Sequence, residues 1–145
     1  MKIKILIIGL PGSGKTTLAK LLTKKLKAFW INADKIRKKY DDWDFSREGV
    51  LRQAKRMAKI ANKTNRKFVI ADFVCPYSKG RKIFEADFLV WMKTVKKGRL
   101  STFDKSFQLP KKVDAIVRKK NAKVISTEIV KKIRNKIIYL KKKGV

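Results

Sequence analysis

An apolar run at residues 3–8 leads directly into Gly9, Gly14, Lys15 and Thr16, which are spaced as G-x-x-x-x-G-K-T. The run is typical of a buried strand, and leucines recur at helical spacing after the motif. Between a strand and a helix, this pattern forms a loop whose backbone N–H groups surround phosphate oxygens. The sequence therefore predicts a site for a nucleoside triphosphate.

The polar residues of this loop have distinct expected roles. Gly12 and Gly14 let the backbone curl toward the phosphates, and the start of the next helix adds the positive end of its dipole. Lys15 is expected to reach the β- and γ-phosphates as a catalytic residue, and the Thr16 hydroxyl is expected to bind Mg²⁺. The predicted ATP-binding residues are Gly12, Ser13, Gly14, Lys15, Thr16 and Thr17.

Length and composition set further limits. The chain has 145 residues, of which 44% are hydrophobic, and we expect one domain over residues 1–145. It has one cysteine, Cys75, and no histidine, so a disulfide within the chain, a Cys/His zinc site and histidine acid–base chemistry are excluded. Without a membrane-length apolar run or a cleavable signal, we expect a soluble cytoplasmic protein with no membrane partner.

The formal net charge of +29 has two interpretations. A charge of this size is found in proteins that bind nucleic acid or another polyanion. However, the basic residues are mostly lysines, which populate solvated surfaces when base composition favours lysine codons, and specific phosphate recognition prefers arginine. We therefore interpret the positive charge first as a solvated lysine-rich surface, and second as a surface that binds nucleic acid or another polyanion.

Short apolar runs alternate with helical patterns along the whole chain. This alternation predicts an α/β protein with a mainly parallel five-stranded sheet and helices on both faces, as in P-loop nucleoside triphosphate hydrolases. The expected strands lie at residues 3–8, 28–31, 67–71, 87–92 and 113–117, and the expected helices at 15–27, 34–40, 47–61, 79–84 and 126–142.

Candidate site residues follow the second and third expected strands. Asp34 and Arg37 are three apart at a helix start, so they share one face, although Asp34 is also a suitable N-cap and Arg37 a suitable surface residue. Asp72 ends the third strand, as does the carboxylate that holds Mg²⁺ in phosphate-loop enzymes, although an aspartate there also suits a turn. We expect all three at the carboxyl edge of the sheet.

Several of these segments, in order, resemble the adenylylsulfate kinase family. Residues 9–17 match its phosphate loop, and residues 32–37 are similar to its D-G-D-x-x-R segment. Residues 44–47 with Arg52 are similar to F-S-x-x-x-R-x-x-N-I-R-R, residues 73–76 with Arg81 to F-I-S-P, and residues 104–110 to D-x-x-Y-E-x-P. Members of this family transfer the γ-phosphoryl group of ATP to the 3′-hydroxyl of adenylylsulfate.

The resemblance implies roles for individual residues. Asp34 would act at the acceptor hydroxyl, as a base or through Mg²⁺. The phosphate and sulfate of the substrate would be held by arginines, and its adenine would contact the ring of Phe45 and the side chain of Val74. The arginines in question are Arg37, Arg47 and Arg52, and the implied metal-binding residues are Thr16, Asp34 and Asp72.

The chain also departs from the family pattern. Asn32 replaces the first Asp of D-G-D and Asp72 replaces a small neutral residue, so we hypothesise that Asp72 supplies the missing carboxylate and orients a Mg²⁺ water. Val50 replaces a substrate-binding Asn, and three residues are missing before Arg47. The basic lid is shortened to residues 91–103, where Lys96, Lys97 and Arg99 form either a reduced lid or a solvated loop.

The acceptor therefore stays open at this point. A small anionic acceptor, adenylylsulfate first, is the main hypothesis, and a nucleotide or polynucleotide kinase is the alternative. A nucleotide-binding module with little transferase activity is the third. Arg118 and Asn121 are weak candidates for the ATP adenine pocket. Cys75 is expected to be a small residue in a tight turn. The sequence does not indicate the oligomeric state.

Overall fold

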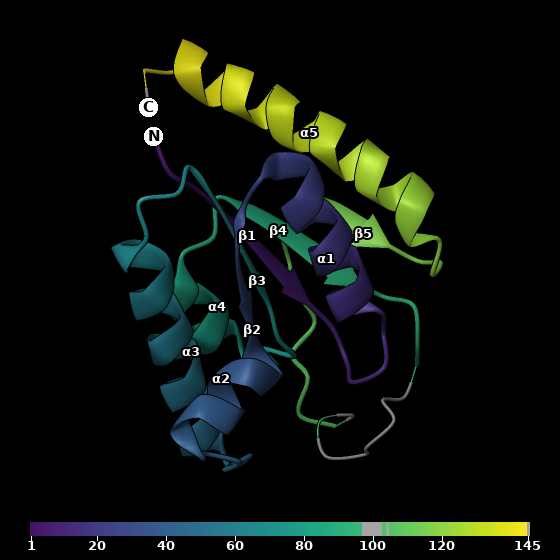
Figure 1. Ribbon diagram of the computed structural model, residues 1–145. Coiled ribbons are helices and arrows are strands. Elements are labelled where there is room, and N and C mark those ends of the chain that lie inside the picture. The colour runs from purple at the N-terminus through teal and green to yellow at the C-terminus, as the bar shows by residue number, and fades with distance from the viewer. Residues whose placement is uncertain (97–102, 104, 145) are drawn as a thin grey trace.

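Five parallel strands form one sheet in the computed structural model, which describes residues 1–96, 103 and 105–144 (Figure 1). The strands are β1 (Ile3–Ile8), β2 (Phe29–Asn32), β3 (Phe68–Asp72), β4 (Phe88–Met92) and β5 (Ala115–Val117). Their order in the sheet is β2-β3-β1-β4-β5, so the predicted five-stranded parallel sheet is confirmed. The helices are α1 (Lys15–Leu26), α2 (Ala33–Tyr40), α3 (Arg47–Lys63), α4 (Ser78–Phe84) and α5 (Ala122–Lys142).

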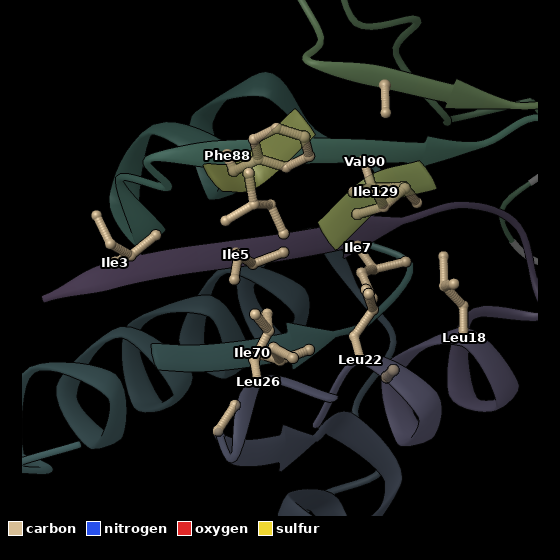
Figure 2. Packing of buried hydrophobic residues seen from close by; sticks show 14 of the residues in the cluster. Ile3, Ile5, Ile7, Leu18, Leu22, Leu26, Ile70, Phe88, Val90 and Ile129 are labelled. Atoms are coloured by element: carbon tan, nitrogen blue, oxygen red, sulfur yellow. The ribbon is translucent and has the colours of Figure 1, made fainter. Parts of the chain in front are cut away.

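β1 lies at the centre of the sheet and is buried on both of its faces. Ile5 and Ile7 pack in one cluster with leucines of α1 and isoleucines of α5, as Figure 2 shows for Leu22 and Ile129. Ile8 packs on the other face, against residues of α3 and α4. Because successive side chains of a strand point to opposite faces, a continuous apolar run is what a doubly covered strand requires. Helices on both faces are therefore confirmed.

The strand order brings the candidate site to one edge. β1 pairs with β3 on one side and β4 on the other. The chain leaves β1 through α1 on one face toward β2, and it leaves β3 through α4 on the other face toward β4, so a crevice opens at the carboxyl ends of these two strands. Asn32 and Asp72 end neighbouring strands and are register partners. Within the described part of the chain, no helix has the length and hydropathy needed to cross a bilayer.

The last helix differs from the expected boundary. It begins at Ala122, about one turn before the serine that the sequence suggests as its start. Ser126 lies within the helix, fully buried, and its hydroxyl donates a hydrogen bond to the Lys123 carbonyl at 2.9 Å. Serine satisfies its hydroxyl on the preceding turn in this way, so it does not need to act as an N-cap.

Candidate active site

The loop between β1 and α1 has the conformation expected of a phosphate-binding loop. Gly12 and Gly14 adopt φ values of 84° and 98°, in the left-handed region that favours glycine. Gly9 could not carry a side chain, because a Cβ there would lie 2.8 Å from the Met92 carbonyl oxygen. The loop therefore needs glycine for conformation at two positions and for space at a third.

Polar contacts hold this loop against the rest of the fold. The Lys15 ammonium donates to the Leu10 carbonyl at 3.0 Å, across the loop. Lys120, from the segment before α5, donates to the Gly12 carbonyl at 2.6 Å, and the Thr94 hydroxyl donates to the Ser13 carbonyl at 2.6 Å. No sequence motif marks Lys120 as a residue of this site, and its position after the last strand is the only signal that the sequence carries for it.

Asp72, which is itself buried, is the centre of a polar cluster beside this loop. Its side chain accepts a hydrogen bond from the Thr16 hydroxyl at 3.0 Å and from the Trp30 indole N–H at 2.7 Å. The Asn32 amide nitrogen lies 3.1 and 3.3 Å from its two carboxylate oxygens. Asp72 therefore links the ends of β2 and β3 to the first turn of α1.

The environment of Asp72 acts on its protonation in two directions. Burial raises the pKa of this carboxyl above its usual range, because a charge is poorly solvated there. The hydrogen bonds from Trp30 and Thr16 and the charge of Lys15 act the other way. A cation bound beside Asp72 would favour the charged carboxylate further.

The donor set in this cluster fits Mg²⁺. Among the described residues there is no group of three or more His, Cys, Asp and Glu side chains that could hold a metal ion by itself. Mg²⁺ does not need one, because it commonly binds one or two protein oxygens, nucleotide phosphates and water. The Thr16 hydroxyl, fixed by a buried carboxylate, supplies such an oxygen.

A cavity of about 490 Å³ extends from the phosphate loop toward α2 and α3. It joins the loop and the Asp72 cluster to residues predicted to contact the acceptor, so donor and acceptor candidates share one space. Its lining residues include, from the predicted set, Gly12, Gly14, Lys15, Thr16, Thr17, Asp34, Arg37, Phe45, Asp72 and Val74. Ser13, Arg47 and Arg52 do not line it.

Asp34 and Arg37 reach this cavity from α2. The N-cap of α2 is Asn32, whose side chain accepts from the Lys35 N–H at 3.1 Å, so Asp34 is not the cap. Asp34 is exposed and lines the cavity. Asp34 therefore belongs to the cavity lining and is not used as the helix cap.

Arg37 is only 5% exposed and is held by the loop that carries Phe45. Its guanidinium donates to the carbonyls of Asp42 and Asp44 at 2.9 and 3.3 Å, and it lies 4.5 Å from the centre of the Phe45 ring. Burial lowers the pKa of this guanidinium, and nearby carboxylates, that of Asp42 first, oppose the effect. Arg37 is therefore a preorganised cation beside an aromatic ring.

The other two predicted acceptor arginines have partners outside the cavity. Arg52 forms ion pairs with Asp42 at 2.8 Å and Asp44 at 3.0 Å, and Arg47 stacks on the Tyr77 ring at 4.5 Å. Both carboxylates lie eight to ten residues from Arg52 in the chain, and Arg52 bonds both oxygens of Asp42, a geometry that orients its guanidinium. The structure does not bring these two arginines to the acceptor space.

Gln53 and Phe103 also line this cavity, although the sequence motifs indicated neither of them. Gln53 is 2% exposed; its amide donates to the Ala33 carbonyl at 2.9 Å, and its Oε1 has no hydrogen-bond partner among the described residues. Phe103 contacts Phe45 edge to face, with ring centres 5.8 Å apart.

A second, smaller cavity of about 150 Å³ adjoins the loop on its other side. Its lining includes Leu18, Met92, Val117 and Ile125, and neither Arg118 nor Asn121 is part of it. Apolar side chains beside a phosphate loop suit a nucleotide base. The reduced lid expected from Lys96, Lys97 and Arg99 lies largely outside the described residues, which include Lys96 but neither of the other two.

Comparison with known proteins identifies the family. The sequence model of the adenylylsulphate kinase family matches residues 1–96. These residues contain the phosphate loop, the Asp72 cluster and most of the cavity lining. No curated protein sequence matches the chain.

Solved structures of several kinases share the fold. The chain superimposes on the Mycobacterium tuberculosis APS kinase CysC in complex with AMPPNP and APS with a TM-score of 0.79 and 17% identity, covering 92% of this chain and 98% of that one. For APE1195 the TM-score is 0.78 with 24% identity, and the superposition covers 92% of this chain and 96% of that one. For shikimate kinase from Acinetobacter baumannii in complex with shikimate, the TM-score is 0.67 with 15% identity, and the superposition covers 93% of this chain and 94% of that one.

Proposed function

The chain belongs to the adenylylsulphate kinase family and is an ATP-dependent phosphotransferase, and from this premise we propose that it phosphorylates the 3′-hydroxyl of adenylylsulfate or of a similar small anionic acceptor. The observation that carries the proposal is the larger cavity, whose lining includes the phosphate loop together with Asp34, Arg37 and Phe45. In-line phosphoryl transfer requires donor and acceptor in one space, and this cavity offers it.

The donor side of the proposed reaction uses the loop and Asp72. The backbone N–H groups around Gly12 and Gly14, with Lys15, would hold the triphosphate of ATP. Thr16 and Asp72 would hold Mg²⁺, which supplies neutralisation of phosphate charge when it is bound. The hydrogen bond from the Thr16 hydroxyl to Asp72 at 3.0 Å supports this role, because it orients the hydroxyl oxygen.

The acceptor side of the proposed reaction uses α2 and the segment after it. Asp34 would accept the proton of the attacking hydroxyl, and Arg37 would bind the anionic group of the acceptor. The Phe45 ring provides a flat apolar surface suited to a base. Because Arg47 and Arg52 are engaged elsewhere, Arg37 is the arginine of the predicted set that lines the cavity.

The proposal is tested by ADP release with ATP, Mg²⁺ and different acceptors. Adenylylsulfate should stimulate ADP release well above the rate without acceptor, and the product should carry the new phosphate at the 3′-position. A 5′-hydroxyl oligonucleotide should not stimulate it. Stimulation by the oligonucleotide alone would replace the proposed acceptor with a nucleic acid, and ATP binding without stimulation by any acceptor would favour a binding module.

A further inference from the structure

Trp30, Asn32 and Asp72 form one hydrogen-bonded unit at the ends of β2 and β3. Asn32 and Asp72 are register partners, and Trp30 lies two residues before Asn32 on the same face of β2. This face is the one that α1 covers, and α1 provides Thr16. The topology therefore directs these side chains to the same point beside the phosphate loop.

The unit depends on the identity of each of its members. The Asn32 side chain accepts from the Lys35 N–H and donates to Asp72, which an aspartate at position 32 could not do. The Trp30 N–H can only donate, and its partner at 2.7 Å is the Asp72 Oδ1 atom. The Thr16 hydroxyl bonds the other oxygen, Oδ2.

We propose that Trp30 and Asn32 are positioning residues that fix the Asp72 carboxylate for the bound Mg²⁺–nucleotide, and that this chain has moved the metal-side carboxylate from the end of β2 to the end of β3. The inference rests on the proposed Mg²⁺ role of Asp72. Neighbouring strands lie about 4.8 Å apart, a displacement that side chains at paired strand ends can span. The 3.1 Å contact between Asn32 and Asp72 demonstrates this reach.

The first test removes the indole N–H and keeps an aromatic ring. Trp30→Phe is compared with Trp43→Phe, the same change at a side chain that is 49% exposed and outside the cavity lining. Calorimetry measures ATP affinity in Mg²⁺ and in EDTA. Trp30→Phe should reduce the Mg²⁺-dependent gain in affinity by roughly 10- to 150-fold, as expected for one hydrogen bond to a charged group, and should leave the affinity in EDTA unchanged.

Trp43→Phe should behave as the unmodified protein in both conditions. An unchanged Mg²⁺-dependent gain in Trp30→Phe would overturn the positioning role of Trp30. An equal loss in Mg²⁺ and EDTA would do the same, because it would indicate a general structural effect. No acceptor is present in this experiment, so a wrong acceptor in the proposed function cannot alter its result.

The second test moves the carboxylate back across the strand pair. Asp72→Asn should lose most of the Mg²⁺-dependent gain, and Asn32→Asp in the same chain should restore at least part of it. The reversed pair keeps its hydrogen bonds matched, because an amide at position 72 can accept from Trp30 and donate to a carboxylate at position 32.

The matched control adds Asn135→Asp, on the exposed side of α5, to Asp72→Asn. It changes the net charge equally and should restore nothing. If Asn32→Asp restores no more than Asn135→Asp does, the two strand ends do not exchange the carboxylate and the inference is wrong. This test needs no change at Trp30, so it stands even if Trp30→Phe fails to fold.

Discussion

Replacing Arg37 with alanine gives the sharpest test of the acceptor side. The guanidinium is buried, it bonds two carbonyls of the loop before α3, and it stacks on Phe45. It is also part of the cavity lining. Arg37→Ala therefore has two separable effects: the loop loses an anchor, and the cavity loses a cation.

The size of each effect follows from these contacts. A hydrogen bond from a charged donor contributes about 1.5–3 kcal/mol, and a cation–π contact at least about 0.5 kcal/mol. Since such contributions are not additive, we expect the free energy of unfolding to fall by roughly 2–4 kcal/mol. If Arg37 holds the anionic group of the acceptor, the acceptor KM should rise by roughly 10- to 150-fold, which corresponds to one charged hydrogen bond.

Steady-state kinetics and ATP binding distinguish the two effects. Arg56→Ala is the matched control, because Arg56 pairs with Asp42 at 2.6 Å and stacks on Tyr40 but does not line the cavity. Arg37→Ala should raise the acceptor KM far more than Arg56→Ala and leave the ATP Kd unchanged. The role of Arg37 in acceptor binding is refuted if both variants raise the acceptor KM equally, or if the ATP Kd of Arg37→Ala rises as much as its acceptor KM.

Three further predictions concern stability and reactivity. Hydrogen bonds from arginines hold the pKa of Asp42 well below its usual range. The ionised Asp42 therefore stabilises the fold above about pH 3.9, and this contribution is lost as the pH falls below that value. The free energy of unfolding should consequently fall less steeply with decreasing pH in Asp42→Asn than in the control Asp41→Asn. Burial raises the pKa of the Cys75 thiol to about 12, so iodoacetamide at pH 8 should label it only as urea unfolds the protein, and rapid labelling of the native protein would contradict this. Ile133→Ala should lower the free energy of unfolding by about 2–5 kcal/mol in urea titrations, because Ile133 is fully buried, whereas Ile138→Ala, at a side chain that is 54% exposed, should have little effect.

Sequence reasoning was most accurate where structure is decided locally. The phosphate loop, its strand and its helix follow from glycine positions and apolar periodicity within a short segment, and the structure has them as predicted. Parallel pairing then places every strand's carboxyl end at one edge. For this reason Asp34 and Asp72, far apart in the chain, were both expected in the crevice, and both line it.

Sequence reasoning was less informative where a side chain selects among several partners. Arg52 matches an acceptor arginine of the family pattern, yet here it pairs with Asp42 and Asp44. The bond between Trp30 and Asp72 depends on the register of β2 against β3, which no local pattern specifies. Gln53 lines the cavity because of how α3 is rotated about its axis, and no sequence motif includes a glutamine at this position.

The distribution of acidic residues relates the net charge to the acceptor site. Five of the eleven acidic residues lie between positions 34 and 48, beside the acceptor half of the cavity. The same segment has five basic residues, so it is neutral in a chain with net charge +29, and two of its carboxylates, Asp42 and Asp44, are paired with arginines. The overall field attracts an anionic acceptor and is screened by salt, whereas the buried Arg37 is screened much less. Added salt should therefore lower kcat/KM in the unmodified enzyme and in Arg37→Ala by the same factor, because the two effects act at different stages of binding.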